Sequence, residues 1–422
     1  MAEGSDCGFA SMKPVLAQSI SLGCTRIYIM GKFGFALAAL VLPTALGAPT
    51  TSRKSSSYVN WRQLKAHGAN LGGWLVQEST INSAWWAEYA GGASDEWGFC
   101  ENLGQQCGPV FEEHYATWIT TADVDKLAEV GITALRIPTT YAAWIHYPGS
   151  QLYSGNQTKY LSEIATYAIE QYGMHVIVDI HGLPGGTNGL TIGEATGHYG
   201  WWYNQTNLDY SLQAVDAVID YIQNSGHPES YSLEPANEAV DNRDFSVFGT
   251  PAALTDKAAA WLLKYYQAVI DHVAAVNPSI PVMLQDSFKG ERFWSGNFST
   301  DANIVFDSHN YWFDDTNATS VTLAKDICTR AKSVAGDGKF PVFVGEWAIQ
   351  AGSNNTFALR ERNLNTGLHA FHQHTQGSSY WTAKFYGNGT VSGQGNQTDY
   401  WNFEGFIDLG LVHLDSNNYK CV

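Results

Sequence analysis

The sequence has few basic residues and lacks the usual metal-binding motifs. Lysine and arginine number 23 against 40 acidic residues, which gives a formal net charge of −17. This balance argues against nucleic acid and other polyanionic partners, and a neutral substrate fits it better. Neither a CxxC…CxxC pair nor an HExxH motif occurs. We therefore expect no structural or catalytic metal.

Long hydrophobic runs are also scarce. The run after Met30, in "MGKFGFALAALVLPTALGAPTT", has about fourteen apolar residues, which suits a signal peptide and is short for a membrane span. We expect residues 1–29 to be an extension that the native protein does not need, 30–47 a signal peptide, 48–60 a disordered lead-in and 61–422 the main folded domain. The alternative is an uncleaved signal anchor. After cleavage, no membrane contact is expected.

Sequons and cysteines favour the same secreted, extracellular or cell-wall location. Seven N-glycosylation sequons occur, at Asn156, Asn204, Asn297, Asn317, Asn354, Asn388 and Asn396. Cys7 and Cys24 fall in the leader, which leaves an even set of four: Cys100, Cys107, Cys328 and Cys421. An even number suits disulfides in an oxidising compartment. Their spacing suggests a Cys100–Cys107 staple and a Cys328–Cys421 bond, although three pairings are possible.

Short apolar segments alternate with helix-like segments along the rest of the chain, as in a parallel sheet with helices outside. The expected strands are 67–73, 134–138, 175–180, 232–236, 281–285, 303–309, 341–347 and 378–383. Expected helices include 121–130, 158–172, 209–224 and 253–276. Eight such units predict an α/β fold, a single (β/α)8 TIM barrel with long βα loops. A two-domain doubly wound fold is the alternative.

Polar residues recur where the expected strands end, and that end carries the functional face of a TIM barrel. Glu346 follows the buried run "PVFVG", and Glu238 follows "SLEPAN". A carboxylate there is costly to hold without a purpose or a partner, so a structural salt bridge is the alternative. Two carboxylates that face one cavity suit glycoside hydrolysis, in which one protonates the leaving oxygen while the other attacks or activates water.

These residues resemble glycoside hydrolase family 5, most closely its fungal exo-β-1,3-glucanases. The resemblance spans residues 66–420 and rests on seven short motifs in family order. They are "LGGWLVQE", "LRIP", "DIHG", "NE", "HNY", "GEW" and "WTAKF". The resemblance implies a retaining TIM-barrel enzyme without a cofactor. Retention implies two carboxyl groups about 5–5.5 Å apart, against about 6.5–9.5 Å for inversion.

By position in these motifs, Glu346 would be the nucleophile and Glu238 the general acid/base. Arg136 would lie beside the nucleophile and keep it ionised, whereas Glu238 would stay protonated near a second carboxylate. The remaining implied roles are Asn237 on the sugar 2-hydroxyl, His181, His309 and Tyr311 in the −1 subsite, Glu78 on sugar hydroxyls, and Trp381 as the stacking floor. Each has a structural alternative, either an ion pair, a satisfied core histidine or plain packing.

The sequence departs from the family pattern at three places. Ser79 replaces the usual proline after Glu78, and Ala239 replaces the one after Glu238. Pro235 falls inside the expected fourth strand, where it removes a ladder N–H, so we expect a bulge or an early strand end. Glu234 is expected to be a buried, hydrogen-bonded barrel residue outside the catalytic set.

The expected function is that of a secreted, monomeric exo-β-1,3-glucanase that releases glucose from cell-wall β-glucan with retention. Within the same class, a β-1,6-glucanase or an endo-acting β-glucanase remains open. The alternative from another class is a non-catalytic glucan-binding wall protein. The presence of Glu238, Glu346 and Arg136 argues against that alternative, because a dead barrel would be free to lose them.

Overall fold

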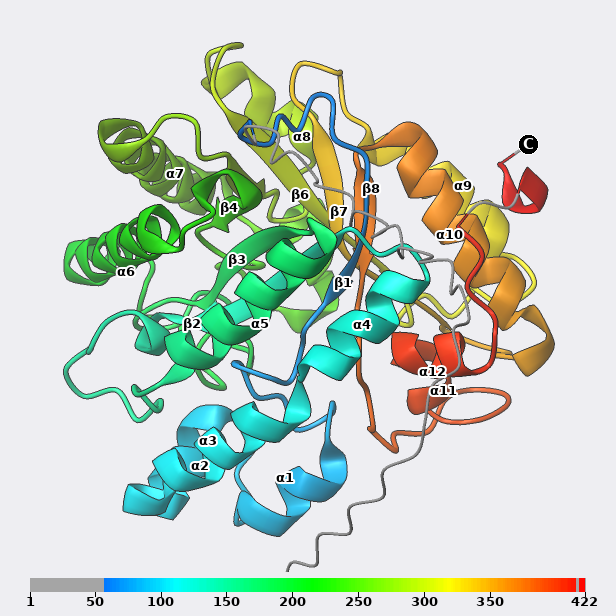
Figure 1. Cartoon of the computed structure of the whole chain (residues 1–422), viewed down its shortest axis with the longest axis horizontal. Helices are drawn as coiled ribbons and strands as arrows, with labels where there is room; N and C mark the ends of the chain where they lie inside the picture. The colour runs from blue at the N-terminus through cyan, green and yellow to red at the C-terminus, as the bar shows by residue number, and fades with distance from the viewer. Residues whose placement is uncertain (1–56, 415–416, 422) are drawn as a thin grey trace, which may run out of the picture. The chain divides into compact units, whose positions relative to one another are not determined.

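A closed barrel of eight parallel strands in sequence order forms the centre of the protein (Figure 1). The structure is a computed structural model that describes residues 57–414 and 417–421. The strands are β1 Ala66–Asn70, β2 Ala134–Thr140, β3 His175–Gly182, β4 Tyr231–Glu234, β5 Val282–Gln285, β6 Ile304–Trp312, β7 Val342–Ala351 and β8 Gly377–Tyr380. Because β8 pairs with β1, the predicted TIM barrel is confirmed.

Helices surround the strands (Figure 1). They are α1 Ser83–Tyr89, α2 Glu96–Leu103, α3 Cys107–Trp118, α4 Thr121–Glu129, α5 Gln157–Tyr172, α6 Gln205–Asn224, α7 Asp256–Val276, α8 Glu291–Trp294, α9 Leu323–Val334, α10 Arg360–His374, α11 Thr398–Trp401 and α12 Phe403–Asp408. The four helices named from the sequence are present as α4 to α7. Within the described residues, no helix is both long and apolar enough to cross a membrane.

The N-terminal segments expected from the sequence lie mostly outside the described residues. The extension 1–29 and the leader 30–47 are not described, nor is the lead-in before residue 57. At the end of that lead-in, Val59 N donates to Glu229 O, and the Tyr58 hydroxyl accepts from Asn277. These last residues therefore contact the barrel.

Side chains that point into the barrel form layers, because inward residues alternate along each strand. The lowest layer is apolar and includes Ala66, Ala134, Ile177, Met283, Val305 and Phe343. Trp61 packs on this layer, with its ring 5.0 Å from that of Phe343, and its indole N–H donates to Ser232. The bottom of the barrel is thus a packed core.

Two positions further along β2, β3 and β6, and four positions further along β1, the inward layer becomes polar. It contains Asn70, Arg136, Asp179, Glu234 and Asp307, all fully buried. Strand register brings them together, since Asn70 lies beside Arg136 and Asp179 beside Glu234. The alternation of inward-facing side chains that forms the apolar layer therefore also forms the base of the candidate site.

Strand β4 ends at Glu234, directly before Pro235. The early strand end expected from Pro235 is confirmed, because proline lacks the N–H that would continue the ladder. The chain then leaves the sheet, which frees residues 235–240 to form the rim of the barrel.

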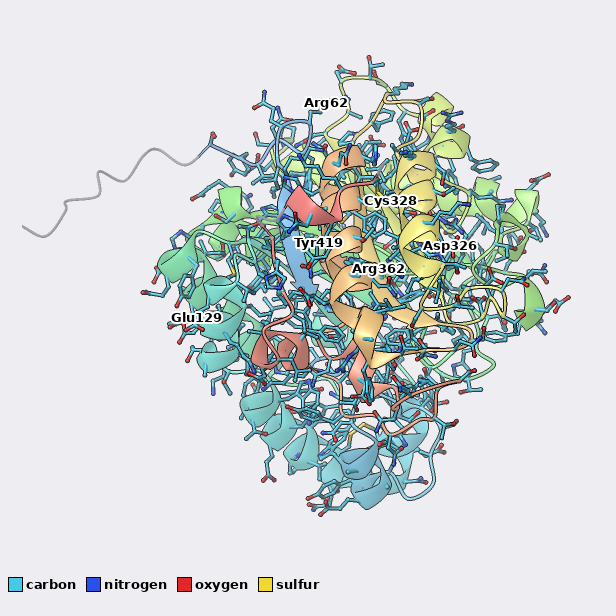
Figure 2. The ribbon with its side chains drawn as sticks, turned by 90° about the vertical axis from the view of Figure 1, so that its right-hand side faces the viewer. Arg62, Glu129, Asp326, Cys328, Arg362 and Tyr419 are labelled. Atoms are coloured by element: carbon cyan, nitrogen blue, oxygen red, sulfur yellow. A yellow bond between two sulfur atoms is a disulfide. The ribbon has the colours of Figure 1, made fainter. Side chains whose placement is uncertain are left out.

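Two disulfides close loops of very different length. Cys100–Cys107 joins α2 to the start of α3, and Cys328–Cys421 joins α9 to the C-terminal segment. In that segment, the Tyr419 hydroxyl donates to Glu361 of α10 at 2.7 Å. The C-terminal segment is therefore fixed against α9 and α10 (Figure 2).

Candidate active site

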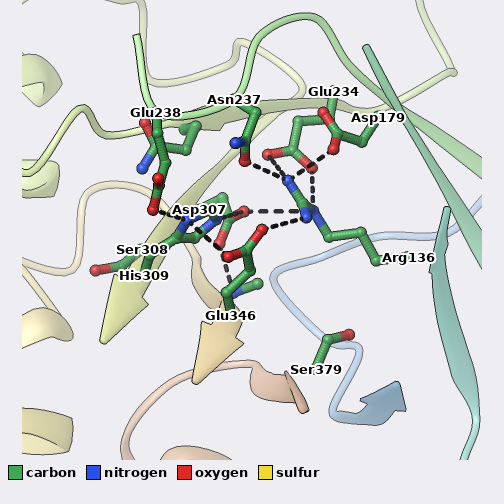
Figure 3. A network of polar contacts seen from close by, with 12 residues as sticks. Arg136, Asp179, Glu234, Asn237, Glu238, Asp307, Ser308, His309, Glu346 and Ser379 are labelled. Carbon is green, nitrogen blue, oxygen red and sulfur yellow. Dashed lines mark hydrogen bonds and ion pairs between the residues drawn. The ribbon is translucent and has the colours of Figure 1, made fainter. Parts of the chain in front are cut away.

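Arg136 lies at the centre of a network of buried acidic and amide groups (Figure 3). Its Nε and Nη2 donate to Glu234 at 2.7 and 3.2 Å. Nη2 also lies 3.0 Å from Asp179, and Nη1 lies 2.8 Å from Glu346. Although burial lowers the pKa of the guanidinium, these carboxylates raise it well above its usual range. A buried cation with this many partners fixes the carboxylates around it.

Glu346 and Glu238 face each other across the top of the barrel. Glu346 Oε1 accepts from Arg136, and its Oε2 accepts from the Tyr311 hydroxyl at 2.8 Å. Glu238 Oε1 lies 2.7 Å from His309 Nδ1. One carboxylate oxygen from each glutamate lies within 4.8 Å of the other. The predicted pair is therefore brought together from the end of β4 and from β7.

The backbone at Glu238 is in the left-handed region, with φ of 43°. For a residue with a Cβ, this conformation costs roughly 1–2 kcal/mol. Its carbonyl accepts from Asn188 Nδ2 at 3.3 Å, and Val240 N donates to Thr187 O. The loop after β3 therefore supports this turn, in which Ala239 stands in place of the family's proline.

His309 lies between three carboxylates. Its Nδ1 is 2.7 Å from Glu238 and 3.4 Å from Glu346, and its Nε2 is 3.0 Å from Asp307. Burial lowers the pKa of the imidazole, but Glu346, Asp307 and Glu238 together raise it well above its usual range. The result is a cation held next to both glutamates.

His181 has a defined tautomer in this arrangement. Asn237 Oδ1 accepts from Arg136, so the amide nitrogen of Asn237 faces His181 Nε2 at 3.1 Å. Nε2 is then the acceptor, and Nδ1 donates to Asp179 at 2.6 Å. The imidazole also stacks on Trp381 at 5.9 Å, which places His181 beside the predicted stacking floor.

A cavity of about 510 Å³ contains most of the predicted site residues. Glu78, His181, Glu238, Tyr311, Glu346 and Trp381 line it. Arg136, Asn237 and His309 contact members of this set, so all nine predicted residues converge. Burial raises the pKa of Glu78 to about 7; His181 opposes this, and Glu346 and Glu238 add to it.

A second cavity of about 510 Å³ adjoins the first at Glu238 and Tyr311. It extends past Phe248, Phe288 and Arg330 and does not include Glu346. The residue expected to protonate a leaving group thus borders both cavities, whereas the expected nucleophile borders only one.

Two sets of side chains offer ligand atoms close enough for a metal ion. They are Glu234, Asp307 and His309, and Glu238, His309 and Glu346. Both sets belong to the network around Arg136, whose fixed positive charge opposes a second cation. The hydrogen bonds already described account for these groups.

Several residues of the site were missed in the sequence. Asp307 lies two residues before His309, and the period of two along a strand would have placed it inside the barrel. Trp401 comes from α11 and stacks on Tyr311 at 5.3 Å, and no periodic signal marks it. The apolar wall of the first cavity, formed by Leu190, Ile192, Phe245 and Phe313, comes from loops.

Comparison with known proteins agrees with this geometry. The profile of Cellulase (glycosyl hydrolase family 5) matches residues 102–387. A probable glucan 1,3-beta-glucosidase A of Aspergillus niger is 31% identical over 316 residues, 73% of this chain and 71% of that protein. Glucan 1,3-beta-glucosidase 1 of Schizosaccharomyces pombe is 30% identical over 333 residues, 75% of each.

Two solved structures are more similar. The crystal structure of rutinosidase from Aspergillus niger is 61% identical, covers 85% of this chain and 100% of its own, and has a TM-score of 0.84. A crystal structure titled AoRut is 66% identical, covers 85% of this chain and 99% of its own, and has the same TM-score. The chain is therefore a glycoside hydrolase and belongs to glycoside hydrolase family 5.

Proposed function

We propose that the chain is a retaining β-glycosidase with Glu346 as the nucleophile and Glu238 as the general acid/base. The observation that supports this most directly is the approach of the two side chains, with oxygens within 4.8 Å. An inverting enzyme needs about 6.5–9.5 Å between its carboxyl groups to admit a water. Oxygens this close favour the shorter separation of a retaining pair, about 5–5.5 Å between carboxyl groups, and direct attack by Glu346 fits it.

In the first step, Glu346 attacks the anomeric carbon while Glu238 protonates the leaving oxygen. Arg136 and Tyr311 each bind one oxygen of Glu346, which orients the carboxylate and keeps it ionised. In the second step, Glu238 takes a proton from water, and the water oxygen displaces Glu346. The sugar leaves with its original anomeric configuration.

The first substrate class that we propose is the rutinosides. The sugar part of these glycosides is a disaccharide that consists of a 6-deoxyhexose and glucose. The 61% identity to a rutinosidase over nearly all of the described chain supports it more strongly than the 31% identity to a glucosidase supports a glucan. The cavity with both glutamates also has an apolar wall that includes Leu190, Ile192 and Phe245. Such a wall suits the methyl group of a deoxysugar better than it suits the hydroxyls of a glucan.

An exo-β-1,3-glucanase that releases glucose from cell-wall glucan is the second candidate. The names of the curated relatives favour it, and Glu78 and Trp381 supply a polar group and a stacking face for glucose. The substrate panel described next also tests three further alternatives: cleavage of β-1,6-glucan, endo-acting cleavage, and a non-catalytic glucan-binding protein.

A panel of substrates separates these candidates. The purified protein is given quercetin 3-rutinoside, quercetin 3-glucoside, a β-1,3-glucan and a β-1,6-glucan, and the first product is followed by proton NMR. The first proposal expects rutinose, released as the β-anomer, at the highest kcat/KM. Glucose from β-1,3-glucan as the best reaction would instead select the second candidate. Initial release of an α-anomer would contradict retention.

Isosteric variants test the two roles. Glu346→Gln and Glu238→Gln each keep the shape of the site, and each should lower kcat on the best substrate by about 10³-fold or more. Glu101→Gln, on the exposed side of α2, is the matched control and should behave as wild type. Full activity in either active-site variant would remove that residue from the mechanism.

We also infer that the protein is secreted as a monomer and glycosylated. The two disulfides support an oxidising compartment. Six of the seven sequon asparagines are exposed; Asn396 is half-buried. Peptide mapping of secreted material and light scattering test this inference. Intracellular retention of the native gene product would contradict it.

A further inference from the structure

Asp307 is a buried carboxylate that takes no part in the reaction as proposed. It lies on β6 with no solvent exposure, and its Oδ2 is 3.0 Å from His309 Nε2. Its Oδ1 accepts the backbone N–H of Gly345, and its Oδ2 also lies 3.8 Å from Arg136 Nε. Both oxygens therefore have fixed partners, and one of these is the imidazole that contacts Glu238 (Figure 3).

The contact with Asp307 decides which nitrogen of His309 holds a proton. A carboxylate only accepts hydrogen bonds, so Nε2 must be the donor, whether the ring is neutral or cationic. In the neutral ring, Nδ1 is then free of hydrogen and points at Glu238 Oε1, 2.7 Å away. In the cation, Nδ1 donates to the same oxygen.

We propose that Asp307 is a positioning residue that keeps a proton on Nε2 of His309, so that Nδ1 exchanges a second proton with Glu238. The inference rests on the general acid/base role of Glu238 in the proposed function. It extends that role to a three-residue relay, Asp307–His309–Glu238, in which Glu238 transfers the proton to the substrate.

The proton count balances over both steps. At rest, the pair of His309 Nδ1 and Glu238 Oε1 shares one proton. In glycosylation, Glu238 gives a proton to the leaving oxygen as the glycosidic bond breaks and the ester to Glu346 forms. The shared proton is then gone, and Nδ1 is a bare acceptor. In deglycosylation, the attacking water returns one proton to the pair, and its oxygen bonds to the anomeric carbon as the ester breaks.

The charges that face His309 favour this role. Five acidic groups approach it, from four strands or strand ends: Glu234 on β4, Glu238 after β4, Asp286 after β5, Asp307 on β6 and Glu346 on β7. Arg136 on β2 is the nearest cation of the network and lies beyond Asp307. Burial raises the pKa of Asp307, but His309 and Arg136 outweigh it and hold that pKa below its usual value. Asp307 therefore stays an acceptor.

The variant Asp307→Asn tests the relay. Its Oδ1 would keep the hydrogen bond from Gly345 N, which turns the amide NH2 group toward His309 Nε2. Nε2 then loses its proton, and Nδ1 carries one permanently. The first test substrate is a phenyl β-glycoside whose sugar is the one that the enzyme hydrolyses best. Its kcat/KM should fall about 10- to 100-fold, because the phenol leaving group needs a proton from Glu238 and this acid assistance is impaired. The 2,4-dinitrophenyl glycoside needs no acid, so its kcat/KM should change less than about 3-fold.

The pH profile gives a second readout. Without the negative charge of Asp307, the proton that Glu238 donates is held less tightly, so the alkaline limb of kcat/KM should move about one pH unit lower. Asp123→Asn is the matched control, because Asp123 is also buried but lies on α4, where its Oδ2 accepts from Thr120 N. It should leave the ratio between the two substrates unchanged. Equal losses on both substrates in Asp307→Asn would overturn the proposal.

A double-mutant cycle separates action through His309 from a direct structural effect. If Asp307 acts through the imidazole, adding Asp307→Asn to His309→Gln should change kcat/KM for the phenyl glycoside less than about 2-fold. Losses that multiply would contradict the relay.

A direct measurement covers the case in which Asp307→Asn does not fold. In wild-type protein with ¹⁵N-labelled imidazoles, His309 Nε2 should stay protonated as the pH is raised. His309→Gln identifies the signal by its loss. A neutral His309 protonated at Nδ1 would overturn the proposal. Because this measurement needs no turnover, it is independent of whether the proposed substrates are hydrolysed.

Discussion

The guanidinium of Arg136 lies 2.8 Å from the carboxylate of Glu346, and Arg136 has no exposed surface at all. The same group binds Glu234, Asp179 and Asn237, so it links the bottom of the polar layer to the rim. Stability and reactivity are therefore expected to be coupled at this residue, because the carboxylate proposed to attack the sugar, that of Glu346, is also part of a buried ionic network.

Arg136→Lys should weaken both properties. Lysine keeps the charge but has no planar fork, so it cannot bind Glu346, Glu234 and Asn237 at once. We expect a loss of about 3–5 kcal/mol in unfolding free energy, and a fall in kcat of about 100-fold or more. Urea unfolding and steady-state kinetics measure the two effects. A folded variant with the kcat of wild type would show that the planar guanidinium of Arg136 is not needed to orient the carboxylate of Glu346.

Replacement of each glutamate by alanine should separate their roles by chemical rescue. Glu238→Ala should keep most of its kcat/KM on dinitrophenyl glycosides, because this leaving group needs no proton, and azide should accelerate turnover to give a β-glycosyl azide. Glu346→Ala should be inactive on the same substrate, and azide should give the α-product. Mass spectrometry and NMR identify the products, and the opposite stereochemistry would exchange the two assignments.

The polar layer could be predicted because it follows the same alternation as the core. Arg136, Asp179 and His309 stand at inward positions where each strand leaves its apolar run, so a barrel prediction brings them together. Asp307 obeys the same rule but was not predicted, because it lies inside the strand, two residues before the polar strand end at His309. The pairing of the cysteines stayed open, since sequence gives spacing and not distance.

The helices α1 to α3 and the loop residues of the cavity could not be predicted. In the segment of α1 to α3, Trp85 stacks on Phe99 and contacts His114 of another helix, so aromatic side chains pack across helices instead of along one stripe. Trp401 reaches the cavity from the short helix α11 and Ile192 from a long loop, and the positions of both segments follow from tertiary contacts and not from any period in the sequence. Substrate preference depends on these residues, which is why it was the least defined part of the sequence prediction.

Removal of the two disulfides should have unequal effects. Cys328–Cys421 spans 93 residues, and Cys100–Cys107 spans 7. In the chain-entropy account, the longer loop contributes about 4–5 kcal/mol and the shorter about 2–3 kcal/mol. The Cys328→Ala/Cys421→Ala double variant should therefore unfold at lower urea than Cys100→Ala/Cys107→Ala. The reverse order would mean that native contacts near α2 dominate over loop closure.

Glu96 should make stability depend on pH in a predictable direction. This α2 residue is 2% exposed, its Oε2 accepts from Gln77 N, and its Oε1 has no hydrogen-bond partner among the described residues. Burial raises its pKa to about 8, so the native state holds a proton that the unfolded chain, with its ordinary carboxyl, has released. Stability from this group is complete at low pH and is lost as the pH rises toward 8.

Glu96→Gln fixes the neutral, hydrogen-bonding form in place. The variant should match wild type near pH 4 and exceed it at pH 8 by on the order of 2 kcal/mol, because only wild type must then bury a charge or retain a proton. Urea unfolding at both pH values measures the difference, with Glu101→Gln on the exposed side of α2 as the control. A variant less stable than wild type at pH 8 would mean that Glu96 is ionised in the fold and held by a cation or by water. That outcome would place a polar group at Oε1, where the described residues provide none.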